Sequence, residues 1–160
     1  MLQTIYLISS LCFPSVAGRP AVCSCRYATS PDQQIADVRS DLRTVDAVFV
    51  GKVTSVLDTL RRSGSFDYHA RRAILTLQAV WKGPTAGSVT ILTGMGLGDC
   101  GIHFTVGERD LVFATADSNG VLFTRACSHT EPLASASRYL AALGEARVPL
   151  APPDSASPPR

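Results

Sequence analysis

Two cysteines separated by one serine constrain the fold of this chain more than any other feature of its sequence. They lie in the stretch VCSCRY, residues 22–27, and Cys100 and Cys127 follow far along the chain. Four cysteines allow three pairings, but a bridge between Cys23 and Cys25 would close a cramped ring with poor geometry. Each of these two is therefore expected to reach a distant partner, which would fix the start of the domain to its body. A four-thiolate zinc site is the alternative, although the sequence lacks the paired C-x2-C knuckles typical of such sites.

The first seventeen residues, MLQTIYLISSLCFPSVA, have the features of a secretory signal peptide. They carry no charged residue, contain an apolar stretch at residues 5–13, and end in small residues that a signal peptidase recognises. We therefore predict a signal peptide at residues 1–17, which would remove Cys12 and send the mature chain to an oxidising compartment, where disulfides are the default. The apolar stretch is shorter than the roughly 20 residues that span a bilayer. We expect a secreted protein without a membrane span, either extracellular or periplasmic.

Length and charge limit the class of protein further. With 160 residues and 17.0 kDa, the chain has room for one hydrophobic core. The net charge of +2 is too small to favour binding to nucleic acid. The one local basic cluster brackets a Ser/Gly segment and is expected on a solvated hairpin tip; it consists of Arg61, Arg62, Arg71 and Arg72. We expect a monomer with no nucleic-acid partner.

The hydrophobic pattern of the first half changes period along the chain. Residues 32–46 place apolar side chains at spacings of three and four, which predicts an amphipathic helix with Asp32 as its cap. Residues 46–60 and 66–83 are rich in apolar β-formers and predict two long strands around an RRSGS turn, the first with a bulge or bend at Gly51. A third strand is expected at residues 88–94.

The second half predicts a hairpin and a closing helix. Residues 108–117 and 119–127 flank a turn that contains an Asn-Gly dipeptide, a strong hairpin signal. Residues 130–144 predict a helix capped by Thr130, with proline near its first turn. The Pro- and Ser-rich residues 145–160 are expected to be a disordered tail. Five strands between two helices favour a mainly β fold, a five-stranded OB-fold Greek-key barrel with an N-terminal and a C-terminal helix, stapled by disulfides.

No catalytic constellation stands out in the sequence. The three histidines lie far apart, without metal-ligand spacing, and are expected to be surface or polar-network residues: His69, His103 and His129. Glu108 and Asp110 sit beside an arginine on a predicted strand, where a solvated face is the better interpretation. We therefore expect a binding protein rather than an enzyme, with no cofactor of its own.

The glycine-rich segment GMGLGDCG, residues 94–101, follows a predicted strand as a phosphate-binding loop does. However, Asp99 and Cys100 stand where such a loop needs a further glycine and the start of a helix. The segment is instead expected to be a surface loop stapled by a disulfide, whose glycines let the backbone pass close to another part of the chain.

Several stretches together resemble one family. They are the C-x-C start, the strand VDAVFVGKV, the segment AVWKG, the block GDCGIHFTVGERDLVFA, and Cys-Ser-x-Thr at residues 127–130 before the last helix. In this order they resemble the N-terminal domain of the tissue inhibitors of metalloproteinases, a netrin-like domain built on an OB barrel. The resemblance covers residues 23–144. It implies that Cys23 pairs with Cys100 and Cys25 with Cys127.

The resemblance also implies a function. In this family the free α-amine and carbonyl of an N-terminal cysteine chelate the catalytic zinc of the protease, and the next side chain enters the specificity pocket. By position, Cys23 would be the zinc-chelating residue, if it is N-terminal, and Ser24 the pocket residue. The implied inhibitory ridge consists of Cys23, Ser24, Cys25, Arg26, Tyr27, Leu97, Gly98, Asp99, Cys100 and Gly101. The chain would then be a secreted metalloendopeptidase inhibitor whose partner is an extracellular or envelope zinc metalloprotease.

The mature N-terminus separates this function from its alternative. Cleavage after Ala17 would leave residues 18–22 ahead of Cys23, and a peptide nitrogen cannot chelate zinc as a free amine does. A chain processed in that way would be a non-inhibitory netrin-like module that binds another extracellular or envelope protein.

Overall fold

A computed structural model describes residues 23–25, 28–85, 87–96 and 98–148 of the chain. The predicted signal peptide, residues 1–17, lies outside these ranges, as does most of the predicted tail. The last described residues of the tail pack on the body of the domain, because the backbone N–H groups of Arg147 and Val148 both donate to the carbonyl of Val80. None of the helices in the described ranges is long and apolar enough to cross a membrane.

The first helix, α1, spans Pro31–Thr44. Its N-cap is Ser30, whose side-chain oxygen accepts a hydrogen bond from the backbone N–H of Gln33 at 3.3 Å. The expected cap, Asp32, was wrong: proline occupies the first helical position, where its missing N–H costs nothing, so the helix begins one residue before Asp32. Asp32 instead lies in the first turn, where a negative charge favours the helix dipole.

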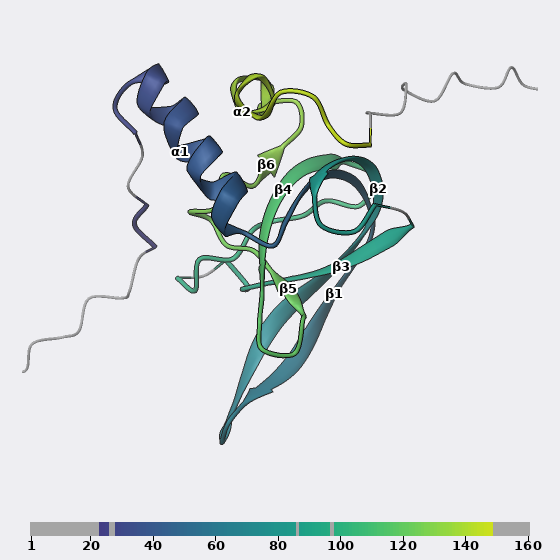
Figure 1. Ribbon diagram of the computed structural model, residues 1–160. Helices are drawn as coiled ribbons and strands as arrows, with labels where there is room; N and C mark the ends of the chain where they lie inside the picture. Colours follow the sequence, from purple (N-terminus) through teal and green to yellow (C-terminus); the bar gives the residue numbers. More distant parts are fainter. Residues whose placement is uncertain (1–22, 26–27, 86, 97, 149–160) are drawn as a thin grey trace, which may run out of the picture.

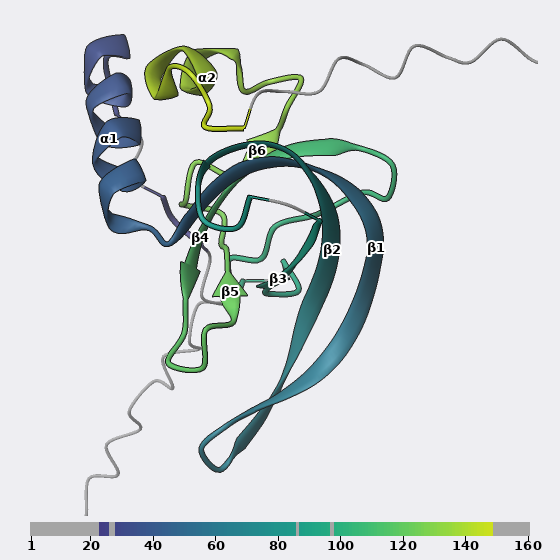
Figure 2. The same ribbon diagram turned by 45° about the vertical axis from the view of Figure 1, so that its right-hand side comes forward.

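Six strands form one mixed sheet that closes nearly into a ring (Figures 1 and 2). The strands are β1 (Ala47–Ser63), β2 (Phe66–Lys82), β3 (Ser88–Thr93), β4 (Arg109–Ala116), β5 (Leu122–Phe123) and β6 (Glu131–Pro132). The order in the sheet is β1-β2-β3-β5-β4-β6, and β1 also pairs with β4. Only the β3–β5 pair is parallel among the described strands.

The long strand β1 bends and pairs with two neighbouring strands. It pairs with β4 over residues 47–52 and with β2 over nearly its whole length. The ladder with β2 shifts register between Val50 and Gly51, which confirms the irregularity expected at this glycine. A Cβ atom at Gly51 would lie 2.8 Å from the Cβ of Leu75, so the two strands can approach this closely only with glycine there.

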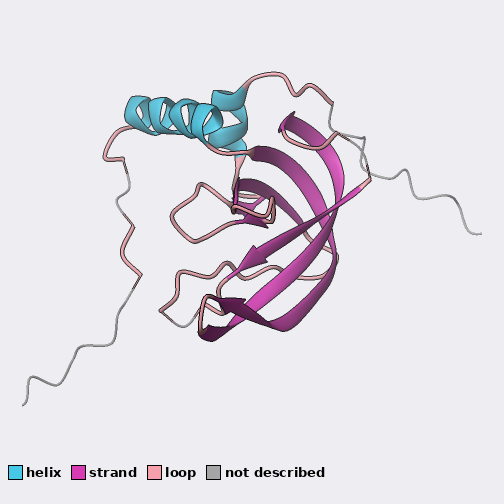
Figure 3. Ribbon diagram, turned by 60° about the horizontal axis from the view of Figure 1, so that its bottom comes forward, coloured by secondary structure: helices cyan, strands magenta, loops and turns pink. Residues whose placement is uncertain are grey.

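The hydrophobic core has two parts, one on each side of the sheet. Phe49, Leu75 and Ile91 fill the inside of the barrel. The outer face of β1 and β4 packs against the two helices through a second cluster that includes Val38 and Phe113. Figure 3 shows both helices lying together over one end of the barrel, so the strands beneath them are buried on both faces.

The predicted closing helix is shorter than expected. The helix α2 spans only Ser137–Leu143, and Thr130 and Pro132 belong to an extended segment that includes β6. This segment is held by β4: Leu133 N–H donates to the Arg109 carbonyl, and the Thr130 hydroxyl oxygen accepts from the backbone N–H of Phe113. Pairing with an open strand edge therefore overrides the helix-start pattern, and it adds a sixth strand to the five predicted.

Asp110 is buried, so the expectation of a solvated strand face was wrong. Its exposed fraction is 2%, and along β4 it alternates with Leu111 so that it shares the barrel-facing side with Val112. Burial, with a smaller contribution from the negative charge of Glu108, raises the pKa of Asp110 to about 6. Within the described residues its Oδ2 atom is buried and has no hydrogen-bond partner.

Candidate functional site

Two disulfides join the start of the described chain to one end of the barrel. Cys23 is bonded to Cys100 and Cys25 to Cys127, with Cα–Cα distances of 5.3 Å in both bridges. This confirms the pairing that the family resemblance implies. The bridges close sequence separations of 77 and 102 residues, so the segment that contains Ser24 is fixed to two loops on either side of β4.

The bridges also decide against a zinc site made of the four cysteines. The sulfur atoms of Cys23, Cys25 and Cys127 lie within 4.8 Å of one another, which resembles a ligand cluster. All three are disulfide-bonded, and a disulfide sulfur is not the thiolate that zinc requires. The cluster is therefore the meeting point of two bridges.

Ser24 is the exposed residue between the two bridges. Its neighbours Cys23 and Cys25 are each half-buried, because their side chains turn toward the body of the domain to reach their partners. The short segment thus presents its middle residue to solvent while both ends are held covalently. Arg26 and Tyr27, the next residues of the predicted ridge, lie outside the described residues.

The glycine loop that carries Cys100 is organised around the carboxylate of Asp99. This carboxylate accepts hydrogen bonds from the backbone N–H groups of Met95 at 2.6 Å, Gly96 at 2.8 Å and Gly101 at 3.2 Å. The bond from Met95 is the largest cause that lowers the pKa of Asp99, because these donors stabilise its charged form. A Cβ atom at Gly94 would lie 2.6 Å from the carboxylate, so glycine is needed for this close approach.

The two loops that receive the bridges are also linked to each other. The backbone N–H of Ala126 donates to the carbonyl of Cys100 at 2.8 Å. Close by, the hydroxyls of Thr124, Ser128 and Thr130 lie 2.8–3.0 Å from one another. This hydroxyl cluster is anchored to β4, because Thr124 and Thr130 both donate to the carbonyl of Phe113. The turn around Cys127 is therefore a rigid support for its bridge.

The predicted site residues fall into two groups, those that the structure describes and those that lie outside the described residues. The Cys23–Cys25 segment and residues 98–101 are brought together by the Cys23–Cys100 bridge. Leu97, like Arg26 and Tyr27, lies outside the described residues. Gly98 and Asp99 are exposed, whereas Cys100 and Gly101 are half-buried. The Cys23–Cys100 bridge thus joins the two described segments of the predicted ridge, and their exposed residues are Ser24, Gly98 and Asp99.

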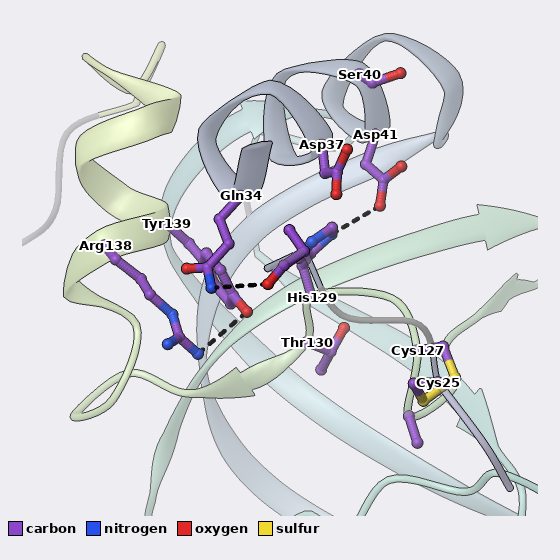
Figure 4. Close-up of a pocket in the computed structure, with 12 residues that line it drawn as sticks. Cys25, Gln34, Asp37, Ser40, Asp41, Cys127, His129, Thr130, Arg138 and Tyr139 are labelled. Carbon is purple, nitrogen blue, oxygen red and sulfur yellow. Dashed lines mark hydrogen bonds and ion pairs between the residues drawn. A yellow bond between two sulfur atoms is a disulfide. The ribbon is translucent and has the colours of Figure 1, made fainter. Parts of the chain in front are cut away.

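A polar pocket of about 490 Å³ lies beside the second bridge and was not predicted from the sequence. It is lined by α1, by α2, and by the turn after Cys127 (Figure 4). In it, Nδ1 of His129 lies 2.8 Å from Oδ2 of Asp41 on α1, and the imidazole packs edge-on against the ring of Tyr139. Figure 4 shows Arg138 and Tyr139 at one end of the pocket and the Cys25–Cys127 bridge at the other.

The contact of His129 with Asp41 has the form of the histidine–carboxylate part of a catalytic triad. Among the described residues, the imidazole has a recorded hydrogen bond only with Asp41, and no hydroxyl lies within bonding distance of it. The contact connects α1 to the turn that follows Cys127. The two residues are 88 positions apart, so no local pattern in the sequence signals their contact.

Comparison with known proteins adds no assignment to this site. A scan against protein-family models and a search of curated proteins both give no match to the chain.

Proposed function

We propose that this chain is a secreted inhibitor of zinc metalloendopeptidases, and therefore a binding protein rather than an enzyme. The observation that carries the proposal is the pair of disulfides that holds Cys23 and Cys25 at one end of the barrel with Ser24 exposed between them. A short, covalently fixed and accessible segment is suited to enter an active-site cleft, because little conformational entropy remains to be lost on binding.

The proposed mechanism uses the backbone of the first cysteine. If Cys23 is the mature N-terminus, its α-amine and carbonyl would chelate the zinc of the target protease and displace the water that the metal activates. The side chain of Ser24 would enter the adjacent specificity pocket. Residues 98–101 would lie alongside as a second contact, and Arg26, Tyr27 and Leu97 would extend the ridge.

The fold assignment within this proposal is an OB-type Greek-key barrel. The strand connections around the ring support it, because β1 pairs with both β2 and β4 while β3 pairs with β5 in parallel. In this assignment β6 is an addition outside the five barrel strands, since among the described strands it pairs with β4 alone.

The test combines the mature N-terminus with an inhibition assay. Intact mass of the exported protein establishes the first residue, and inhibition constants are then measured against a panel of zinc endopeptidases. We expect a chain that begins at Cys23 to inhibit at least one of them. One alanine added before Cys23 should weaken inhibition by about 100-fold or more, equivalent to about 2.8 kcal/mol of binding free energy, because it converts the chelating amine into a peptide nitrogen. Ser24→Ala leaves the chelating amine in place and shortens only the side chain proposed to enter the specificity pocket, so it should weaken inhibition much less than the added alanine does.

The alternative is a non-inhibitory netrin-like module of the extracellular space or cell envelope. The observation that favours it is the small-residue cleavage signal ending at Ala17, which would leave residues 18–22 ahead of the cysteine. An exported chain that begins at Gly18 and inhibits no protease of the panel would exclude the zinc-chelating mechanism and support this alternative.

A further inference from the structure

The tip of the β1–β2 hairpin is a two-stranded arm with two open edges. β4 pairs with β1 only as far as Lys52, and β3 pairs with β2 only from Arg71 onward. Beyond these points, residues 55–63 of β1 and 66–70 of β2 pair only with each other in the described sheet. Figures 1 and 2 show the arm extending past the other strands, and Nη2 of Arg61 on the arm lies 3.9 Å from Oδ2 of Asp117 in the turn that follows β4. Open edges of this kind present unpaired backbone groups to any further strand.

The arm also carries apolar side chains that the domain does not cover. Leu60 is 60% exposed and Phe66 is 76% exposed, and Leu57 and Tyr68 are also exposed. Leu60 lies near the middle of the open β1 edge. Residues of this type are unusual on an unpaired edge, because they favour association with another apolar surface.

One face of the arm carries opposite charges on the two sides of Leu60. In the ladder, Asp58 lies opposite Arg71, Leu60 opposite His69, and Arg62 opposite Asp67, and because these positions alternate along each strand they share a face. Nε of Arg71 lies 3.0 Å from Oδ1 of Asp58, and Nε of Arg62 lies 2.8 Å from Oδ1 of Asp67. Along the open edge the face therefore reads negative, apolar, positive.

We propose that this edge of β1 pairs with the same edge of a second copy of the chain, antiparallel, about a two-fold axis at Leu60. The proposal goes beyond the inhibitory function and departs from the monomer expected from the sequence. The occupant is identified by charge complementarity: Asp58 of one copy would lie opposite Arg62 of the other, and the symmetry produces this ion pair twice. Leu60 would lie opposite Leu60 of the second copy and would be removed from water.

The geometry of antiparallel pairing restricts the possible registers. Opposite residues either both direct their backbone groups toward each other or both direct them away, and the two cases alternate along a strand. When an edge pairs with itself, a residue and its partner must therefore be an even number of positions apart, so the two-fold axis must pass through a residue.

Only one of these registers places opposite charges against each other, because Asp58 is the only acidic residue at positions 55–63 and Arg62 is the only arginine there that lies an even number of positions from it. An axis at Asp58, Arg61 or Arg62 would place each of these charged side chains opposite its own copy. An axis at Thr59 would place Asp58 opposite Leu60. Charged residues commonly protect open edges from pairing, and here they oppose these registers while favouring the one centred on Leu60.

That register would also complete a row of alternating charge across four strands. From one copy to the other, the row would read Asp67, Arg62, then Asp58 and Arg71 of the second copy. Within the described residues, Oδ2 of Asp58 has no recorded hydrogen-bond partner, so it is available for a second arginine. Because exposed ion pairs are screened by salt, the association should weaken as ionic strength rises.

The test is a charge-swap experiment on the exported, disulfide-intact chain, with mass measured by sedimentation equilibrium over a concentration series at low salt. The wild-type chain should approach twice its monomer mass at high concentration. D58R and R62D should each remain monomeric, because like charges then face each other in the proposed register. An equimolar mixture of the two should again approach twice the monomer mass, since the arginine introduced in one variant would face the aspartate introduced in the other.

Two controls separate pairing from an effect on folding. Circular dichroism of each variant must match the wild type, and recovery of the dimer in the mixture requires that both variants be folded. R43D and E145R, which change exposed charges outside the arm, should leave the dimer unchanged. A wild-type chain that stays monomeric throughout, single variants that still dimerise, or a mixture that does not would each overturn the proposal.

Discussion

Replacing Asp110 with asparagine should stabilise the protein, although it removes a native side chain from the core. Asp110 is 2% exposed, faces the barrel side of β4, and has a buried carboxylate oxygen without a partner in the described structure. A charged carboxylate in this position loses its hydration without a compensating cation or donor. Asparagine has nearly the same shape and no charge, so it removes this penalty without opening a cavity.

The magnitude follows from the pKa of Asp110. Burial and then the charge of Glu108 raise this pKa from 3.8 to about 6. The folded state thus binds the proton more tightly than the unfolded state, so stability falls as pH rises from about 4 to 6 and the full penalty is present above 6. A difference of about 2 pKa units corresponds to about 3 kcal/mol as an upper limit. For a domain of this size that is a rise in Tm of roughly 10 °C.

The assay is urea unfolding of wild type and Asp110→Asn at pH 4, 5, 6 and 7. We expect the stability of the two proteins to be similar at pH 4, where Asp110 is protonated in the folded state, and to diverge as pH rises to 7. Glu108→Gln is the control, because it removes only the smaller, charge-based contribution to the pKa of Asp110 and should stabilise less. Equal stabilities at pH 7, or a constant difference across the pH range, would refute the reasoning.

Two further predictions concern the loops that hold the ridge. Asp99→Asn should loosen residues 94–101, and this should be seen as faster amide exchange at Met95, Gly96 and Gly101. In the wild type, the same loosening should occur when acid protonates the Asp99 carboxylate. Because the pKa of Asp99 is lowered, this should happen only below the usual pH range of aspartate titration. Replacing both Cys25 and Cys127 with alanine should lower the free energy of unfolding by up to about 4.7 kcal/mol, which is the loop-entropy value for a bridge of this span. Urea unfolding measures this loss. A loss below about 1 kcal/mol would contradict the prediction.

The elements that were predicted well are those whose signal is local. The change from helical to alternating period located α1, β1, β2 and β3 to within a few residues, and glycine marked the irregularity of β1 at Gly51. Apart from the helix cap at Asp32, which a neighbouring proline displaced, the errors arose where distant contacts decide the conformation. Thr130 and Pro132 form a helix-start pattern, but the edge of β4 and the backbone of Phe113 hold this segment extended.

For the candidate site, only the disulfide bridges were predicted from the sequence. Reasoning from spacing alone excluded a bridge between Cys23 and Cys25, and the family resemblance was needed to choose between the two remaining pairings. The pocket beside the second bridge could not be predicted, because it depends on the contact of His129 with Asp41 across 88 residues. The burial of Asp110 was missed for a related reason: its alternation with Leu111 is visible in the sequence, but the covering of both faces of β4 is not.

The two bridges matter because the sheet does not hold the Cys23–Cys25 segment by itself. No backbone hydrogen bond to this segment is recorded among the described residues, so its position depends on its bonds to Cys100 and Cys127. Both partners lie in loops that are independently rigid, one organised by the Asp99 carboxylate and the other by the hydroxyl cluster on β4. The bridges therefore transfer the rigidity of the barrel to a segment outside it. The β1–β2 arm, in contrast, is continuous with the sheet and needs no bridge, so disulfide reduction should release the ridge while leaving the pairing edge in place.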